Sequence, residues 1–260
     1  MEQPKDDQKY RAPALDKGLD ILELLAREPG GMTRSEIVTA MGRRPGEIYR
    51  MLERLIAREY VVRSVGGDRY AISMKLFLIG SSHPPMRRLT ALAEPLMDLF
   101  ANKTLQSIHL SILEGQKLIV VAQSSSPAQW EFKLRIGAEL GLFDTGSGLT
   151  IMAFLDDLTI QRLTGSDKSC SPTLPLKRRS KLQTELDEIK KAGLRASESG
   201  QLKGVIDISV PILGPDGNAI AVITCPFIER VKEKDSPNKG MDLNSIQTEL
   251  LNLAEKISIR

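Results

Sequence analysis

The clearest pattern in the sequence is Pro45-Gly-Glu-Ile-Tyr-Arg-Met-Leu-Glu-Arg-Leu-Ile-Ala57. Proline fits the first position of a helix, because its missing N–H would have no partner there. Apolar residues then follow at the spacing i, i+3, i+4, i+7, i+8, which predicts an amphipathic helix with one face in a core. These residues are Ile48, Met51, Leu52, Leu55 and Ile56.

The opposite face of this helix is basic. Arg50, Arg54 and Arg58 are spaced i, i+4, i+8 and stack above one another. Like charges at this spacing cost about 0.2–0.5 kcal/mol per pair. We interpret the stripe as a surface for a polyanion, because solubility alone does not require it. The alternative is a small helical domain whose arginines are simply solvated.

The flanking segments predict a winged helix-turn-helix. A helix is expected over Leu15–Arg27, and Thr33-Arg-Ser-Glu36 has the pattern of a capping box that opens a second helix. Gly42 is suited to end that helix. After the third helix, Tyr60–Ser64 and Arg69–Ser73 predict two strands of a hairpin. Three short helices followed by a hairpin is the order of this DNA-binding motif.

Double-stranded operator DNA is therefore the expected partner of the first domain. Arginine can hydrogen-bond guanine at two positions or clamp a phosphate, and the hydroxyl of Tyr49 can reach a phosphate oxygen. Arg63 and Arg69 would belong to the wing. The candidate DNA-binding residues are Thr33, Arg34, Arg43, Arg44, Glu47, Tyr49, Arg50, Arg54, Arg63 and Arg69.

The rest of the chain alternates strand and helix patterns, which predicts an α+β domain with a mainly antiparallel sheet. We expect a flexible arm over 1–12, the winged helix-turn-helix over 13–73, a linker helix region over 74–86 and a second domain over 87–260. The predicted strands are Ser107–Leu113, Lys117–Gln123, Trp130–Ile136, Val205–Leu213 and Ala219–Pro226. The predicted helices are Arg87–Thr104 (with Leu89, Leu92, Leu96, Leu99 and Phe100 on one side), Gly148–Asp156, Lys177–Ala192 and Asp242–Ile257, and Arg230–Gly240 is expected to be a charged loop.

Composition narrows the class of protein. The 260 residues are 41% hydrophobic and 27% charged, which is typical of a folded protein. The net charge is +3, from 36 basic and 33 acidic residues, and Gly31–Ser64 alone carries this excess with seven Arg and four Glu. No apolar run approaches the roughly 18 residues of a membrane helix. Cys170 and Cys225 give no disulfide framework. We expect a cytoplasmic protein with no membrane partner.

Catalytic patterns are absent from the sequence. It has no metal-ligand spacing, no phosphate-binding P-loop and no nucleophile elbow. We therefore predict no catalytic residues, no metal and no cofactor. The rival interpretation is a metabolite-binding enzyme or sensor whose basic N-terminal helix contacts a protein partner.

Segments along most of the chain carry a family resemblance. They include Ala14-Leu-Asp-Lys-Gly-Leu-Asp-Ile-Leu-Glu-Leu-Leu25, Ile48-Tyr-Arg-Met-Leu-Glu-Arg-Leu55, Arg135-Ile-Gly-Ala-Glu-Leu-Gly-Leu142, Thr145-Gly-Ser-Gly148, Ile208-Ser-Val-Pro-Ile212 and Ala219–Thr224. In order and spacing, the chain resembles the IclR-type bacterial transcriptional regulators over nearly all of Leu15–Ile257. The resemblance implies a winged-helix DNA reader joined to a GAF-like α+β effector-binding domain. It also implies a homodimer or homotetramer that binds a pseudo-palindromic operator, as a repressor or an activator, and senses a small metabolite.

The segment Thr145–Gly148 has a chemical interpretation of its own. It precedes a predicted helix, whose free backbone N–H groups form a ready anion site; an ordinary capped helix is the alternative. The resemblance implies an effector pocket that binds a small carboxylate or aromatic acid. Its expected residues are Thr145, Gly146, Ser147, Ser197, Asp207 and Thr224.

The sequence departs from the family at Phe143, Leu149 and Ser197, where the family commonly has His, Lys and an acidic residue. It also departs at Pro226, because the family's closing strand usually ends Ser-x-Ser-Gly-Pro and this chain reads Thr224-Cys-Pro226. These changes favour a different, more apolar or aromatic ligand, or a pocket that has lost effector binding. A buried Asp207 would argue against a simple carboxylate unless it is protonated or offset by a cation.

Overall fold

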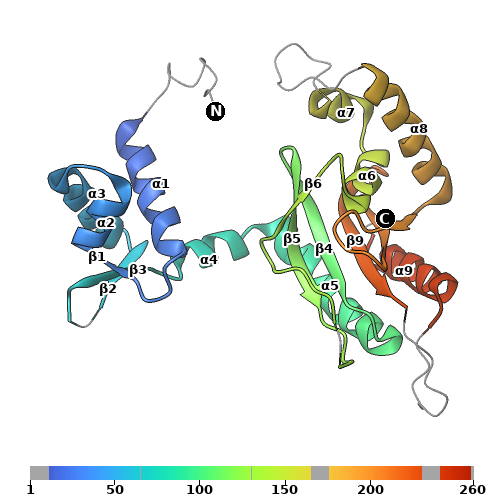
Figure 1. Ribbon diagram of the computed structural model, residues 1–260, viewed down its shortest axis with the longest axis horizontal. Coiled ribbons are helices and arrows are strands. Elements are labelled where there is room, and N and C mark those ends of the chain that lie inside the picture. The colour runs from blue at the N-terminus through green and yellow to red at the C-terminus, as the bar shows by residue number, and fades with distance from the viewer. Residues whose placement is uncertain (1–11, 65, 130, 165–175, 230–240, 259–260) are drawn as a thin grey trace. The chain divides into compact units, whose positions relative to one another are not determined.

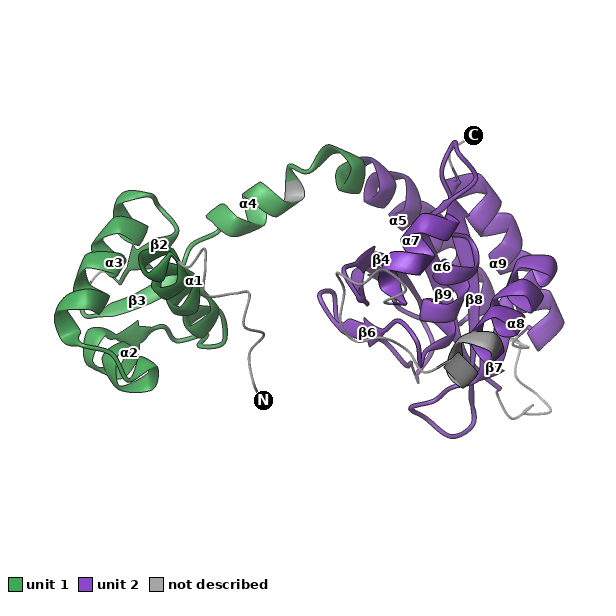
Figure 2. Cartoon of the chain, turned by 90° about the horizontal axis from the view of Figure 1, so that it is seen from above, with its two compact units in different colours: residues 1–87 green, residues 88–260 purple. Residues whose placement is uncertain are grey.

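The computed structural model describes residues 12–64, 66–129, 131–164, 176–229 and 241–258. The chain forms two compact units, Met1–Arg87 and Arg88–Arg260 (Figure 2). The finer division into arm, winged domain and linker stays a prediction. Residues 1–11 of the expected arm, Cys170 and most of the expected loop Arg230–Gly240 lie outside the described residues.

Three helices build the first unit: α1 (Pro13–Ala26), α2 (Arg34–Met41) and α3 (Pro45–Ala57). The capping box at the start of α2 is confirmed. The Glu36 backbone N–H donates to the Thr33 hydroxyl at 3.3 Å, and the Thr33 N–H donates to the Glu36 carboxylate at 2.7 Å. The turn into α3 is equally specific, because Gly42 ends α2 with φ +58°, a conformation that glycine adopts without strain.

A small antiparallel sheet completes this unit. It contains β1 (Met32–Thr33), β2 (Val61–Arg63) and β3 (Arg69–Ile72) in the order β1-β3-β2 (Figure 1). The predicted hairpin is confirmed by the pairing of β2 with β3. The two-residue strand β1 was not predicted, because it is too short to show an alternating pattern. The core of the unit contains Ile21, Leu25, Ile37, Ile48, Leu52 and Tyr70.

Two helices follow: α4 (Lys75–Ser81) and α5 (Pro84–Thr104). The apolar stripe expected on α5 is partly wrong, since Leu92 and Leu99 are 45% and 67% exposed. The buried face is rotated around the helix axis, so that Ala93 and Met97 are fully buried while Leu92 and Leu99 face outward. This face presents Leu89, Ala93, Met97 and Phe100 to the core.

The second unit is built on a six-stranded antiparallel sheet in the order β6-β5-β4-β9-β8-β7. This confirms the predicted antiparallel α+β domain. Its strands are β4 (Ile108–Glu114), β5 (Lys117–Ser124), β6 (Glu139–Gly141), β7 (Arg195–Glu198), β8 (Val205–Leu213) and β9 (Ala219–Ile228).

The strand expected over Trp130–Ile136 is wrong. Residues 131–136 form no strand, and β6 pairs with β5 further along the chain instead. The alternating pattern has another cause. Phe132 and Leu134 turn toward a pocket, while Lys133 pairs with Glu131 at 2.8 Å. The alternation of apolar and charged residues over 131–134 therefore reflects one side that lines a pocket and one side that faces away from it, and not a strand in a sheet.

Helices cover both faces of the sheet (Figure 1). The helices α5 and α9 (Leu243–Ile257) pack on one face, and α6 (Gly146–Ala153) and α8 (Leu176–Ala192) pack on the other. The predicted helix Gly148–Asp156 begins and ends earlier than expected. Asp156 instead caps a separate helix, α7 (Asp157–Leu163), by accepting from the Thr159 N–H at 2.9 Å.

Candidate functional site

The third helix separates its apolar and basic faces. Ile48 and Leu52 are fully buried in the core of the first unit. On the other side of α3, Arg50 and Arg54 are exposed. Arg43 and Arg44 are also exposed, just before the helix begins. Helix-turn-helix proteins place this end of the recognition helix in the major groove.

The acidic residue of this face has an internal partner. The Lys17 ammonium on α1 lies 2.7 Å from the Glu47 carboxylate, and this hydrogen bond lowers the pKa of Glu47. Lys17 therefore holds the negative charge of Glu47 against α1. The sequence predicted that Glu47 faces DNA, but the pair gives it a structural role at the α1–α3 contact.

Tyr49 links α2 and α3, the second and third helices of the first unit. Its ring is 5.5 Å from the guanidinium carbon of Arg34, a cation–π contact, and 44% of the residue is exposed. Because Arg34 opens α2 directly after Thr33, the contact joins the start of α2 to α3. Tyr49 and Arg34 thus lie together on the exposed surface beside the arginine stripe.

The two arginines of the hairpin have different partners. Arg63 donates to the Tyr70 hydroxyl at 2.9 Å and lies over the same ring. Arg69 donates to the carbonyls of Gly30 and Gly31 at 3.1 and 2.8 Å and lies 3.4 Å from Glu36. Arg69 therefore fastens the hairpin to the loop before α2. The predicted contact of Arg69 with DNA stays a prediction. The hydrogen bonds to Gly30 and Gly31 and the ion pair with Glu36 give this side chain a structural role within the first unit.

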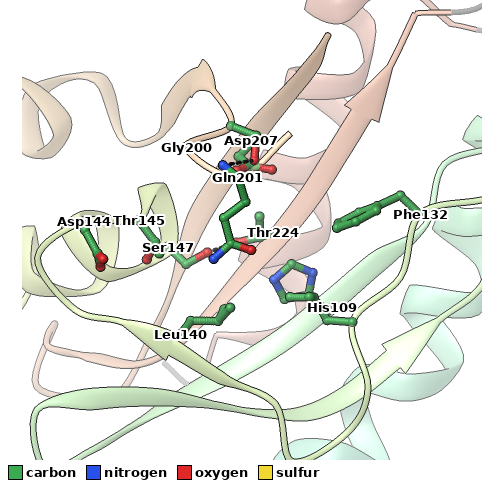
Figure 3. Close-up of a pocket in the computed structure, with 12 residues that line it drawn as sticks. His109, Phe132, Leu140, Asp144, Thr145, Ser147, Gly200, Gln201, Asp207 and Thr224 are labelled. Carbon is green, nitrogen blue, oxygen red and sulfur yellow. Dashed lines mark hydrogen bonds between the residues drawn. The ribbon is translucent and has the colours of Figure 1, made fainter. Parts of the chain in front are cut away.

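A cavity of about 40 Å³ lies in the second unit between the sheet and the start of α6 (Figure 3). Four of the predicted effector residues line it: Thr145, Ser147, Asp207 and Thr224. Gly146 and Ser197 are close by but not in the lining; a Cβ on Gly146 would lie 3.7 Å from the Ser197 hydroxyl. The sequence did not predict the other lining residues, which are His109, Phe132, Leu134, Leu140, Asp144, Ser199, Gly200 and Gln201.

Buried hydroxyl groups form a row that begins in the cavity lining, with Ser147 and Thr224, and continues to Ser209 behind it. The Thr224 hydroxyl lies 2.9 Å from that of Ser147 and 2.9 Å from that of Ser209. The pairing of β8 with β9 sets Ser209 directly opposite Thr224. The Thr145 hydroxyl, by contrast, is used in capping: it donates to the Gly141 carbonyl and accepts from the Gly148 N–H.

His109 enters the cavity from β4, where it pairs with Thr224 of β9. Figure 3 shows its imidazole and the amide of Gln201 extending into the same space. His109 is 4% exposed, and its Nε2 atom has no hydrogen-bond partner. Desolvation by burial lowers its pKa to about 4, so the ring is neutral at pH 7.

Asp207 brings a carboxylate to the same cavity from β8. Burial raises its pKa, and a hydrogen bond from Ser199 partly opposes that change. Within the described ranges, no group of three or more His, Cys, Asp or Glu residues could hold a metal ion. Among the described helices, none is long and apolar enough to cross a membrane.

The fold and these two sites define a class: a transcriptional regulator with an N-terminal helix-turn-helix and a C-terminal effector domain. Family comparison agrees over both units. The IclR helix-turn-helix domain matches residues 14–64, and the family described as "Bacterial transcriptional regulator IclR C-terminal" matches residues 86–259. The chain belongs to the IclR family of bacterial transcriptional regulators.

Curated relatives are regulators and not enzymes, which confirms the prediction of no catalytic activity. The chain is 25% identical to the HTH-type transcriptional regulator KdgR of Escherichia coli, over 69% of each protein. It is also 25% identical to the HTH-type transcriptional regulator BhcR of Paracoccus denitrificans, over 81% of this chain and 76% of the relative.

Solved structures show the same fold. The Thermotoga maritima IclR superposes with a TM-score of 0.70 at 22% identity, covering 94% of this chain and 96% of that one. An IclR homologue from Microbacterium hydrocarbonoxydans, complexed with 4-hydroxybenzoate, gives a TM-score of 0.72 at 18% identity, covering 94% and 97%.

Proposed function

We propose that the protein binds a pseudo-palindromic operator as a dimer, with α3 of each copy in the major groove. The observation that carries this proposal is the exposed arginine stripe opposite the buried face of α3. Arg43, Arg44, Arg50 and Arg54 are the proposed contacts to bases and phosphates, with Tyr49 beside them. Thr33, Arg34 and Arg63 would approach the backbone from the start of α2 and the wing. We infer a cytoplasmic location, because the protein must reach its operator DNA in that compartment.

Exposed apolar side chains on α1 and α4 support self-association. Leu15 and Leu19 of α1 and Phe77 and Leu78 of α4 are each about half exposed or more, between 48% and 63%. Apolar side chains grouped in this way often mark a surface for another protein. We propose a homodimer through these helices; a homotetramer would need a further contact within the second unit.

We propose that a small-molecule effector binds in the cavity beside α6. Four of the six residues expected for that role line it, and the Microbacterium relative supports a small organic ligand in this family. The effector must bind one operator-binding state better than the other, because equal affinity for both shifts nothing. Its class, expected from the sequence to be a carboxylate or an aromatic acid, stays a prediction.

The DNA proposal is tested by fluorescence anisotropy on the DNA upstream of the gene, over a series of salt concentrations. The double variant Arg50→Ala/Arg54→Ala should lower operator affinity by about 10²-fold or more, since each lost base contact costs about 1–3 kcal/mol. The salt slope should flatten by about 0.9 for each lost phosphate contact. Arg27→Ala, at the exposed end of α1, is the matched control. Equal binding by the double variant and the control would reject α3 as the reading helix.

The effector proposal is tested by thermal shift with a library of small acids, alcohols and aromatics. Ser147→Trp fills the cavity, whereas Asn252→Trp adds the same ring to an exposed position on α9. A cavity ligand stabilises the wild type and Asn252→Trp but not Ser147→Trp. A ligand that stabilises all three proteins equally binds elsewhere and contradicts the proposed site.

A further inference from the structure

We propose that the cavity beside α6 selects a small, uncharged compound with hydroxyl groups on a short carbon chain, and that it discriminates against a carboxylate of the same size. The inference rests on the proposed effector response and names the chemistry of its ligand. It departs from the acid expected from the sequence, because the structure shows which charges line the site.

The charged groups in the lining are acidic. Among the described residues that line the cavity, the ionisable groups are the carboxylates of Asp144 and Asp207 and the imidazole of His109. His109 is held neutral by burial, and so contributes no positive charge to an anion. A bound carboxylate would therefore lie near Asp144 and Asp207, and like charges repel more strongly in a partly buried space than in water. Burial raises the pKa of Asp207, so this repulsion acts in full only where Asp207 is ionised. The backbone N–H groups at the start of α6 attract an anion, and the two carboxylates oppose that attraction. An uncharged ligand avoids this repulsion.

His109 points to a ligand independently of the charges. Its side chain is buried and aimed into the cavity, and its Nε2 atom has no partner among the described residues (Figure 3). Buried polar atoms are nearly always hydrogen-bonded, so this atom marks a position that a ligand or water completes. A hydroxyl group suits it in either tautomer, because a hydroxyl both donates and accepts. A carboxylate can only accept.

The remaining polar groups fit the same ligand. A second hydroxyl can donate to the Asp207 carboxylate and accept from the Gln201 amide, which reaches into the cavity from the opposite side to His109. The Ser147 hydroxyl lies at the floor, where α6 begins. These groups together satisfy two or three hydroxyls on adjacent carbons.

Size and apolar surface limit the carbon skeleton. The cavity has about 40 Å³ of space, against the roughly 150 Å³ of an engineered cavity that holds benzene. The small enclosed space favours a ligand with few carbon atoms. Phe132, Leu134 and Leu140 form an apolar wall, against which a methyl or methylene group can pack. A three-carbon chain with hydroxyls toward one end meets both requirements.

Three matched probes separate the possibilities. They share a methyl group and a hydroxyl-bearing carbon, and differ only in the third group: 1,2-propanediol is uncharged, lactate is an anion and 1-amino-2-propanol is a cation. The chain has two histidines, His83 and His109, so His83→Gln leaves one set of ring signals in the NMR spectrum. His83 is exposed, which makes this a mild substitution. Shifts of the His109 ring signals then report binding in the cavity itself.

We expect 1,2-propanediol to bind at least about tenfold more tightly than lactate, a difference of 1.4 kcal/mol. Asp207→Asn should reduce this ratio mainly by improving lactate binding, because it removes one negative charge and keeps an acceptor. Asp157→Asn, exposed at the start of α7, should leave the ratio unchanged. If the Asp207→Asn protein does not fold, the ratio of 1,2-propanediol to lactate affinity in the protein that keeps Asp207 is sufficient to test the inference.

Several results would overturn the inference. Lactate binding as tightly as 1,2-propanediol would show that the acidic lining does not select, and tightest binding of 1-amino-2-propanol would make the site a cation site. It also fails if no probe shifts the His109 signals up to about 0.1 M, a concentration that corresponds to a binding free energy of only about −1.4 kcal/mol. The proposed effector response is judged separately: a library acid that stabilises the wild type but not Ser147→Trp keeps that function while this inference fails.

Discussion

Replacing Thr224 with valine tests the row of hydroxyls beneath α6. The Thr224 Oγ1 atom is the shared partner of two other hydroxyls, 2.9 Å from Ser147 and 2.9 Å from Ser209. All three residues are buried. Valine has nearly the shape of threonine, so the substitution removes one oxygen and leaves the packing of β9 in place. Both serine hydroxyls then lose the same partner.

The expected size follows from these two bonds. A hydrogen bond contributes about 1 kcal/mol net to stability, and a buried hydroxyl without a partner costs about 1–3 kcal/mol. Ser147 lies at the cavity and can bind water instead, whereas Ser209 is fully buried. We therefore expect Thr224→Val to lower the free energy of unfolding of the second unit by about 2–4 kcal/mol. Ser209→Ala breaks only one bond and should cost about 1 kcal/mol.

Urea unfolding measures these differences. The single tryptophan, Trp130, falls within the residue range of the second unit, and its fluorescence is the signal to record. The triple variant Ser147→Ala/Thr224→Val/Ser209→Ala removes every hydroxyl of the row and leaves none unpaired. It should be more stable than Thr224→Val alone, because paired removal is nearly neutral. If Thr224→Val loses no more stability than Ser209→Ala, or if the triple variant is the least stable, the hydroxyls do not stabilise one another as a row.

Three further predictions concern stability. Thr33→Ala removes one half of the capping box and should lower the stability of α2 by about 1 kcal/mol, seen as faster hydrogen exchange of its amides while Gly42 still ends the helix. Gly148→Ala should prevent the second unit from folding, because the added Cβ would lie 2.2 Å from the Leu142 carbonyl oxygen. Gly18→Ala is the control, since its Cβ would meet nothing within 4 Å, and it should raise the free energy of unfolding by roughly 0.5–1 kcal/mol. Thermal melts followed by circular dichroism compare the two variants. His109 is neutral when folded, with its pKa lowered from 6.5 to about 4. The unfolded chain therefore binds more protons in this range, so the free energy of unfolding should fall as the pH drops from 6.5 toward 4, and less so in His109→Gln. An equal pH dependence of urea unfolding in both proteins would contradict this assignment.

Local patterns predicted the first unit well because short-range chemistry determines it. Thr33 and Glu36 are three residues apart and satisfy each other's backbone groups. Ile48 and Leu52 follow the period of one helix and fill one core. No partner distant in sequence is needed to recognise either feature. Contacts between distant segments leave no such local pattern, and so the pairs of Lys17 with Glu47 and of Arg69 with the loop before α2 were not predicted.

The second unit was harder to predict because its cavity is built by strand pairing. His109 and Thr224 are far apart in sequence and become neighbours only when β4 pairs with β9. A lone histidine within an apolar strand gives no signal of that pairing. The loop that supplies Gln201 has no periodic pattern either. The family resemblance supplied Ser147, Asp207 and Thr224, which are a small part of the lining.

The alternation of Phe132 and Leu134 shows how a correct pattern leads to a wrong element. Period-two spacing separates two sides of an extended chain, whatever lies on those sides. Here one side contacts a cavity and the other carries charges. A strand also needs a neighbouring strand to hydrogen-bond with, and the sequence of a single segment does not contain that information.

The hydroxyls of Ser147, Thr224 and Ser209 are bonded in series, and either atom of each pair can donate. All the hydrogens can therefore point one way along the series or all the other way. In one direction Ser147 offers the cavity a proton, and in the reverse direction it offers a lone pair. Reversal needs only rotation about C–O bonds, with no movement of heavy atoms. The same three hydroxyls can therefore accept a hydrogen bond from one ligand and donate a hydrogen bond to another, with no substitution among them. Changes in ligand specificity during evolution would then arise at the other residues that line the cavity.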